Sequence, residues 1–416
     1  MYETAMPTVT SNLIGLTRPE LEDLALDLGQ PRYRGRQLYR GLYRNLLQHT
    51  DDFTTLDRGL RRELAGRCQI AYPSVLREIT SRDRSIRYLL GLADGEEVEA
   101  VYMPWRVEQR GGRAVATPSG RELRVAGSAG RSAAGIGNGK RRATEESLDS
   151  EATESEEPRT TLCISSQAGC AVGCTFCFTG LMGVRRNLTS GEIVGQVLAI
   201  AREQGLWGAT GGKSAAAAKS SPRVGIVFMG QGEPLLNLRA VVSSVSVLTD
   251  TEGCAIPLRR ITISTAGIVP RIYDLGREVT RPKLAISLNA SHDEQRDALM
   301  PINRKYPLSV LMEACRAYPL RPRERLTFEY VMLDGINDAD EDAVRVARLL
   351  ERLPARVNLI PYNGGAALSY RPSPMERVYS FQQALRERGV PAFIRISRGQ
   401  DIMAACGQLS LEGVDS

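Results

Sequence analysis

The chain has 416 residues, of which 42% are apolar and 25% are charged. This composition is typical of a globular protein with one large and one smaller domain, and it excludes a mainly disordered chain. The sequence contains no apolar run of the roughly 20 residues that cross a bilayer, and its first residues do not resemble a secretion signal. We therefore expect a cytoplasmic protein that makes no membrane contact. The net charge of +6 is compatible with a polyanionic partner but identifies none.

The numbers of histidines and cysteines limit the kinds of metal and catalytic site that the chain can form. With only His49 and His292 available, a histidine-rich metal site or a Ser-His-Asp triad is disfavoured. Eight cysteines in so long a chain, three of them in one short motif, indicate metal-binding or catalytic thiols in a reducing compartment.

Three short helices are predicted within residues 1–75. Thr17 and Glu20 have the spacing of a capping box at the start of a helix over residues 17–28, and leucines at helical spacing predict two more over 35–47 and 57–67. We expect a helical accessory domain. The stretch from Pro31 to Arg44 carries arginines and tyrosines that would suit RNA phosphates and bases, or equally a solvated basic face over core tyrosines. These residues are Arg32, Arg34, Arg36, Arg40 and Arg44 with Tyr33, Tyr39 and Tyr43.

The next segment contains a predicted hairpin and an insertion. Two β-rich runs, 85–92 and 97–103, flank the turn dipeptide Asp94-Gly95, which predicts a hairpin within a linker over residues 76–105. Residues 106–158 are rich in Gly, Ser, Ala and charge, so we expect a disordered insertion. A second insertion over 207–222 contains a Gly-Lys-Ser string, but Trp207 stands where a P-loop requires glycine, which excludes a nucleotide-hydrolase site.

Strands and helices alternate through the remainder of the chain. Helical patterns such as 190–204 and 338–352 fall between apolar, β-rich runs, so we predict an α/β fold with parallel strands and right-handed crossovers. Both a barrel and an open sheet place their chemistry at the C-terminal strand ends. The predicted strands cover residues 161–165, 224–229, 260–264, 283–288, 326–332, 356–360 and 392–396.

Cys170, Cys174 and Cys177 follow the first of these strands in a C-x3-C-x2-C spacing. Three thiolates this close can hold one metal centre but cannot fill four ligand positions. A structural zinc site closes with four protein ligands, whereas a 4Fe–4S cluster on three cysteines keeps one iron open for a small molecule. The spacing therefore indicates a catalytic cluster.

Glycine and polar residues follow the other strands. A glycine-rich turn containing Gly232 lets a ligand approach the backbone, and the neighbouring Glu233 could pair with a ligand amine. Ser264, Asn289 and Asn363, at three further strand ends, could hydrogen-bond a ribose or a carboxylate. Because C-terminal strand ends meet on one face, we expect a shared ligand site.

Several motifs in order carry a family resemblance. The string CAVGCTFC at 170–177 resembles the cluster motif of radical S-adenosylmethionine (SAM) enzymes. Six further strings resemble the RlmN/Cfr family of radical SAM RNA methyltransferases, in particular its RlmN branch: RNLT at 186–189, MGQGEPLLN at 229–237, RRITIST at 259–265, MPIN at 300–303, EYVML at 329–333 and AACGQ at 404–408. The resemblance implies a partial (β/α)6 TIM-like barrel of the radical SAM type over 159–400, followed by a C-terminal loop over 401–416.

The resemblance also implies the cofactors. Cys170, Cys174 and Cys177 would bind a 4Fe–4S cluster whose open iron chelates SAM, with two SAM molecules used per turnover and an electron donor such as flavodoxin or ferredoxin. The SAM contacts would be Gly232, Glu233, Ser264, Ser287, Leu288, Asn289 and Asn363.

Two further cysteines and one glutamate receive catalytic roles from the resemblance. Cys406 would accept a methyl group from SAM, Cys163 would resolve the resulting RNA adduct by forming a disulfide, and Glu99 would act as the proton acceptor. The simpler interpretation of such cysteines is a small buried thiol, which we expect for Cys68, Cys254 and Cys315.

The implied reaction is methylation of carbon 2 of adenine in 23S ribosomal RNA and transfer RNA by a monomeric enzyme. Two alternatives stay open: a Cfr-type enzyme that methylates carbon 8, and a non-catalytic zinc-binding protein associated with RNA. Two positions depart from the family pattern, since Gln231 stands where methionine is usual and Asn289 where histidine is frequent.

Overall fold

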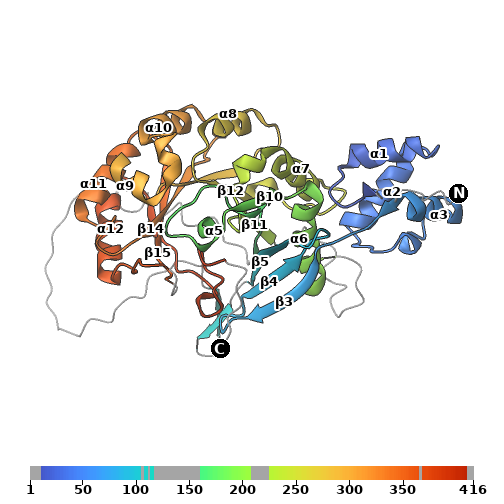
Figure 1. Ribbon diagram of the computed structural model, residues 1–416, viewed down its shortest axis with the longest axis horizontal. Helices are drawn as coiled ribbons and strands as arrows, with labels where there is room; N and C mark the ends of the chain where they lie inside the picture. The colour runs from blue at the N-terminus through green and yellow to red at the C-terminus, as the bar shows by residue number, and fades with distance from the viewer. Residues whose placement is uncertain are drawn as a thin grey trace, which may run out of the picture.

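The computed structural model describes residues 11–104, 107–110, 113–116, 160–207, 224–364 and 368–409. Figure 1 shows a curved sheet with helices along its outer side, and a cluster of helices from the N-terminal region at one end. Within the described residues, no helix is both long and apolar enough to span a bilayer.

The N-terminal region consists of α1 (Arg18–Asp27), α2 (Arg32–Tyr43) and α3 (Arg58–Arg67), with a short parallel pair of β1 (Ser11–Asn12) and β2 (Cys68–Gln69). These helices lie where the leucine spacing predicts them, although α2 ends earlier than expected. The predicted capping box is present, since the Thr17 amide donates to Glu20 Oε2 at 2.7 Å.

Two tyrosines of α2 serve the fold, and Arg36 forms an ion pair at the surface. Tyr39 and Tyr43 are fully buried, and the Tyr39 hydroxyl donates to the Val247 carbonyl, which joins α2 to the neighbouring α7 (Leu238–Thr249). Arg36 pairs with Glu22 at 2.8 Å. Two of the three tyrosines are therefore unavailable for stacking on bases, as the core interpretation predicted, while Tyr33 is exposed.

Ten strands form the main sheet, in the order β16-β15-β14-β13-β12-β11-β8-β5-β4-β3. The seven predicted strands are present, all pair in parallel with one another, and form the curved part of the sheet in Figure 1. The predicted α/β fold with parallel strands is thus confirmed. These strands are β8 (Thr160–Cys163), β11 (Val224–Phe228), β12 (Ile261–Thr265), β13 (Lys283–Ser287), β14 (Leu326–Met332), β15 (Ala355–Pro361) and β16 (Ala392–Ile394).

Three antiparallel strands extend this sheet: β3 (Ser74–Thr80), β4 (Ile86–Gly91) and β5 (Glu97–Met103). The predicted hairpin corresponds to β4 and β5, but it is more than a linker, because β5 pairs directly with β8. The alternation pattern did not indicate β3, whose side chains are mostly exposed.

The cysteine motif lies between two short strands that pair in antiparallel fashion, β9 (Gln167–Gly169) and β10 (Val184–Asn187). Residues 107–110 and 113–116 form a separate antiparallel pair, β6 (Val107–Arg110) and β7 (Arg113–Ala116). The sequence predicted no regular structure there. The rest of that insertion, and residues 208–223 of the second one, lie outside the described residues.

Helices pack along the outer side of the parallel strands (Figure 1). Leu162, Ile226 and Ile261 lie opposite one another on β8, β11 and β12, and all three are fully buried in the main apolar core. Burial on both faces explains why these strands read as continuous apolar runs. Besides α7, the helices are α6 (Ser190–Glu203), α8 (Val269–Arg277), α9 (Asp293–Leu299), α10 (Leu308–Ala317), α11 (Asp340–Leu349) and α12 (Met375–Glu387).

The other face of the sheet, on the inside of the partial barrel, leads to the predicted site residues. Val101, Cys163, Val227 and Thr262 lie opposite one another across β5, β8, β11 and β12, so their side chains share a face. Because side chains alternate along a strand, Ser264 lies on that same face, two residues beyond Thr262. The inner face of the partial barrel therefore brings together residues from widely separated parts of the chain.

Candidate active site

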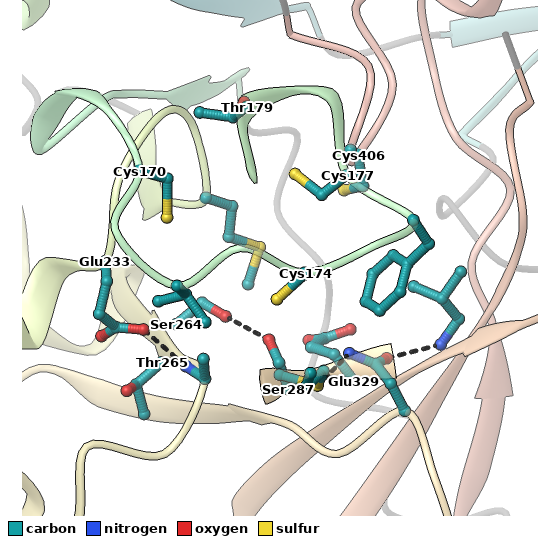
Figure 2. Close-up of a pocket in the computed structure, with 18 of the residues that line it drawn as sticks. Cys170, Cys174, Cys177, Thr179, Glu233, Ser264, Thr265, Ser287, Glu329 and Cys406 are labelled. Atoms are coloured by element: carbon teal, nitrogen blue, oxygen red, sulfur yellow. Dashed lines mark hydrogen bonds between the residues drawn. The ribbon is translucent and has the colours of Figure 1, made fainter. Parts of the chain in front are cut away.

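A cavity of about 920 Å³, including its open mouth, lies at the C-terminal ends of the parallel strands. Its walls include the three motif cysteines, most of the predicted SAM contacts and Cys406. Figure 2 shows the sulfur atoms of the three motif cysteines directed toward a shared space, with Glu233 on one side and Cys406 on the other. The structure thus gathers into one cavity residues that the sequence places far apart.

Local hydrogen bonds shape the cysteine loop. The Cys170 amide donates to the Gly183 carbonyl at 2.8 Å, and the Cys177 amide donates to the Cys174 carbonyl at 3.2 Å. Burial raises the pKa of Cys170 to about 12 and also raises the pKa of Cys174 and Cys177. Such thiols become thiolates only when positive charge is placed beside them.

The donor set fits an iron–sulfur cluster better than a single ion. In the described part of the chain, no three His, Cys, Asp or Glu side chains are placed to hold one metal ion together. Cys170, Cys174 and Cys177 instead surround part of the cavity, and clusters with three cysteine ligands use thiolates of this kind. The polar residues on the opposite wall leave room for a ligand on the fourth side.

The glycine-rich turn after β11 forms one wall. Gly232 has a φ of +98°, and a Cβ added there would lie 2.6 Å from the Gln167 Cβ, so both backbone conformation and space require glycine. Glu233 is buried, and its carboxylate accepts hydrogen bonds from the Ala266 amide at 2.6 Å and the Leu235 amide at 3.0 Å. Burial raises the pKa of Glu233 to about 7, although these bonds favour the carboxylate.

The neighbouring strand ends supply hydroxyl groups. The hydroxyls of Ser264 and Ser287 lie 3.5 Å apart, and both residues line the cavity (Figure 2). Beside them lies Glu329 of β14, which accepts a hydrogen bond from the Asn358 side chain at 2.9 Å. Burial raises the pKa of Glu329. The sequence interpretation did not select Glu329 as a site residue, although its strand position, opposite Ser287 in the register, could have indicated it.

For three of the predicted SAM contacts, the side chain is buried or already hydrogen-bonded within the protein. Asn289 lines the cavity, but its side-chain oxygen already accepts from the Val331 amide at 2.9 Å. Leu288 is fully buried beneath the cavity wall, where its amide donates to the Glu329 carbonyl. Asn363 does not line the cavity and donates instead to the Ser397 hydroxyl at 2.6 Å, while the preceding Tyr362 lines it.

A buried arginine that the sequence interpretation did not select supports these strand ends. Arg296 of α9 is fully buried, and its guanidinium donates to the backbone carbonyls of Ala266, Ser287 and Leu288 at 2.7 to 3.1 Å. It also donates to the Asn303 side chain at 3.0 Å. The charge at this position thus fixes two strand ends and the MPIN motif relative to one another.

The loop of residues 399–409, hereafter the Cys406 loop, closes the cavity on the other side. The Phe178 amide donates to the Gly407 carbonyl at 2.9 Å, and the Thr179 hydroxyl donates to the Leu409 carbonyl at 2.8 Å. Both donors belong to α5 (Phe178–Leu181), directly after Cys177. These contacts place Cys406 beside the cysteine motif.

Cys406 itself is exposed within the cavity mouth. Loss of solvent around the sulfur raises the pKa of the Cys406 thiol to about 11, and the neighbouring Glu329 and Cys177 add to this effect. The thiol therefore stays protonated at neutral pH until a positive charge lies nearby.

Cys163 lies at the end of β8, outside the lining of the cavity. It packs against Val101 and Leu409, and burial raises its pKa, with a further contribution from the nearby Cys406. The predicted pair of thiols is thus brought into one region by the Cys406 loop.

Glu99 lies on β5, on the face of the sheet that Cys163 shares. Its carboxylate is buried and accepts hydrogen bonds from Arg87, one of them at 2.7 Å to Oε1. Among the described residues, Oε2 has no hydrogen-bond partner. Burial raises the pKa of Glu99 to about 7, although Arg87 opposes the shift. This carboxyl is thus poised to exchange a proton near neutral pH.

Comparisons with known proteins agree with this geometry. Residues 164–347 match the radical SAM superfamily, and residues 11–70 match the ribosomal RNA large subunit methyltransferase N-terminal domain. The chain is 46% identical to the "Probable dual-specificity RNA methyltransferase RlmN" of Koribacter versatilis, over 92% of this chain and 96% of that protein. It is 42% identical to the "Dual-specificity RNA methyltransferase RlmN" of Anaeromyxobacter sp. strain Fw109-5, over 99% of this chain and 94% of the relative.

One solved structure extends the likeness to three dimensions. A radical SAM methyltransferase from Sphaerobacter thermophilus superposes with a TM-score of 0.76 at 39% identity, and the match covers 97% of this chain and 100% of that one. Fold and sequence are therefore similar over nearly the whole length.

Proposed function

Because the chain belongs to the RlmN family of radical SAM RNA methyltransferases, we propose that it methylates carbon 2 of adenine in 23S ribosomal RNA and transfer RNA. The observation that supports this most is the presence of Cys406 in the same cavity as the three motif cysteines and Glu233. A cysteine there can take up a methyl group from a ligand bound between the two walls.

Cys170, Cys174 and Cys177 would hold a 4Fe–4S cluster, with Gly232, Glu233, Ser264 and Ser287 around the bound SAM. Such a cluster supplies the electron that cleaves SAM to methionine and a 5'-deoxyadenosyl radical. A reductant such as flavodoxin or ferredoxin would deliver that electron. Glu233 is buried, and its carboxylate would form a charge-assisted hydrogen bond with the ammonium group of a ligand.

Cys406 would act first, because its thiolate can displace the methyl group from the sulfonium of one SAM. A second SAM is consumed when the methyl carbon loses hydrogen and is joined to adenine, so two SAM molecules are used per turnover. The exposure of Cys406 in the cavity mouth suits this role, since the target base must reach the same sulfur.

Glu99 and Cys163 would complete the reaction. Glu99 would accept the proton from carbon 2 of adenine, and its raised pKa suits a base that works near neutral pH. The Cys163 thiolate would attack the sulfur of Cys406, so that a disulfide forms as the bond between sulfur and carbon breaks. The carbon would leave with the electron pair of that bond and take up a proton to become the methyl group of the RNA. Reduction of this disulfide by an external thiol would restore both cysteines.

The N-terminal helices would contribute to RNA binding as an accessory domain, which the match of residues 11–70 to a ribosomal RNA methyltransferase domain supports. A base that is paired and stacked in a helix cannot enter such a cavity, so the enzyme would act on bases in loops or unstacked regions.

The decisive measurement is mass spectrometry of RNA treated with the anaerobically reconstituted enzyme. We expect a brown protein that contains iron and sulfide and that produces 2-methyladenine. A methyl group at carbon 8 would assign the chain to the Cfr-type reaction instead. A colourless zinc protein, or an intact cluster without RNA methylation, would overturn the proposal.

A further inference from the structure

Arg87 of β4 connects two groups to which the proposed reaction assigns separate roles. Its guanidinium donates to Glu99 and, through Nη1, to the Ile402 carbonyl of the Cys406 loop at 3.2 Å. The side chain is only 4% exposed. One buried cation thus joins the sheet that carries Glu99 to the loop that carries Cys406, across 315 positions of the sequence.

The register of the sheet explains why Arg87 reaches both groups. Arg87 lies opposite Val101, and Glu99 precedes Val101 by two residues, so all three side chains share one face. Cys163 lies opposite Val101 on the next strand, on that same face. The Cys406 loop covers this face, because Leu409 packs against Val101 and Cys163.

Further contacts hold the same end of the loop on the turn between β3 and β4. The Ser81 hydroxyl donates to Asp401 at 2.6 Å, the Arg82 amide donates to Asp401 at 3.0 Å, and the Gly399 amide donates to Asp83 at 3.3 Å. The other end of the loop is held separately by α5 through Gly407 and Leu409. Cys406 therefore lies between two independent anchors.

The backbone of the first anchor is held in a costly conformation. Met403, directly after the Ile402 carbonyl that Arg87 binds, has a φ of +54°, a region that non-glycine residues rarely occupy. Such a residue persists only where its surroundings determine the conformation. Contacts from Arg87 and the β3–β4 turn meet that requirement.

On the basis of the proposed function, we propose that Arg87 is a positioning residue, which docks the Cys406 loop in register with the Glu99 carboxylate so that proton removal and adduct resolution occur at one place. Arg87 binds neither SAM nor RNA in this scheme. It acts by fixing the carboxylate and the loop carbonyl with donors of fixed geometry, which a lysine with its single ammonium group cannot reproduce.

The first test measures the loop without requiring activity. In hydrogen–deuterium exchange of the full-length protein, Arg87→Lys should exchange amides within residues 399–409 at least about tenfold faster than wild type, because the carbonyl anchor is lost. Amides of β14 serve as the internal reference. Arg345→Lys is the matched control, since Arg345 also contacts a carboxylate and a second oxygen, at Asp342 and Ser291, but lies on α11. Unchanged exchange in residues 399–409 would overturn the docking role.

The second test separates the steps of the reaction. With Arg87→Lys we expect methylation of Cys406 within about twofold of wild type, because α5 still anchors Gly407 and Leu409. Release of methylated RNA should fall at least about tenfold, and a covalent adduct between Cys406 and RNA should accumulate. Lysine keeps the charge beside Glu99, so a role limited to charge balance predicts normal release, which would contradict the proposal.

A second variant guards against failure of Arg87→Lys to fold. Asp401→Ala removes the contacts with Ser81 and Arg82 and leaves the pairing of Arg87 with Glu99 in place. It should also speed exchange in residues 399–409 and slow RNA release. A variant that does neither would refute docking of the Cys406 loop on this side of the sheet. If the wild type itself never methylates Cys406, the proposed function fails, and the exchange data still decide whether Arg87 docks the loop.

Discussion

The two sides of the cavity are built by different means. The strand-end wall follows directly from the parallel strands of the sheet, and Arg296 holds its backbone carbonyls by hydrogen bonds. This wall consists of Gly232, Glu233, Ser264, Ser287 and Glu329. The loop wall, formed by residues 399–409, is held by side-chain contacts to the β3–β4 turn, Arg87 and α5. The first wall is suited to holding a cofactor in fixed geometry.

The difference also has a functional meaning. A loop that is held by a few polar contacts opens at lower free energy than a strand in the centre of a sheet. Cys406 must meet a SAM ligand, a nucleic acid base and Cys163 in turn under the proposed function. Placing this cysteine on the less stable wall permits movement that the strand ends would not allow.

The largest expected effect concerns the loop wall. Replacing Cys406 with Ala removes the proposed nucleophile, so RNA methylation should fall by a factor of at least about 10³. Cluster content and SAM binding should persist, since Cys170, Cys174 and Cys177 would hold the cluster and the strand-end wall would hold SAM. Cys315→Ala serves as the control, because Cys315 is a core thiol away from the cavity. Methylation by Cys406→Ala at more than a tenth of the wild-type rate would contradict the assignment.

Replacing Arg296 tests how much this residue stabilises the strand-end wall. Its replacement by Met leaves several buried oxygens without a donor, and we expect a loss of about 3 kcal/mol or more in the free energy of unfolding. Urea denaturation measures this loss, with the exposed Arg271→Met on α8 as the control. A loss of less than 1 kcal/mol would show that the strand ends hold their positions without Arg296.

The raised pKa of Glu99 predicts how the stability of the protein depends on pH. The pKa of Glu99 lies near 7 in the folded protein and near 4.5 as an ordinary glutamate, so the unfolded chain loses this proton first as the pH rises. Stability should therefore fall between pH 4.5 and 7, by on the order of 2 kcal/mol, and Glu99→Gln should flatten that fall. The exposed Glu78→Gln on β3 should keep the wild-type slope. An unchanged slope in Glu99→Gln would exclude the raised pKa.

The smallest effect is expected at Gly232. Alanine there must adopt a φ of +98°, which by itself costs about 1 to 2 kcal/mol, and its Cβ would displace Gln167, so SAM affinity should fall about tenfold. Gly29→Ala is the matched control, since its φ is also positive and nothing lies within 4 Å of the added Cβ. Calorimetric titration with SAM compares the two variants, and equal affinities would show that this turn does not shape the ligand site.

The sequence predicted the strand-end wall better than the loop wall. Apolar runs located the seven parallel strands, and polar residues directly after them, such as Ser264 and Ser287, were found in the cavity. The same logic placed Asn363 in the ligand site, where the structure instead has it bonded to Ser397. A strand end specifies the edge of the sheet on which a residue lies but leaves the direction of its side chain to local packing.

The arginines of α2 show a second limit of prediction from the sequence, which is that partners distant along the chain cannot be identified. Composition alone could not separate an RNA-binding face from a set of ion pairs, because Glu22 and Glu252 lie 14 and 212 positions from Arg36 and Arg40. Only the packing of α2 against its neighbours reveals these partners. The buried Tyr39 and Tyr43 belong to the core, whereas Arg36 and Arg40 form these ion pairs and stay more than half exposed.

By itself, the sequence determined the cluster motif, the order of strands and helices, and the convergence of strand ends, because local spacing and hydrophobic period are properties of short segments. The tertiary structure decided that Cys406 lies beside Cys177, that Arg296 ties the strand ends together and that Arg87 joins Glu99 to the Cys406 loop. These contacts depend on distances between segments far apart along the chain, which only the packed fold sets.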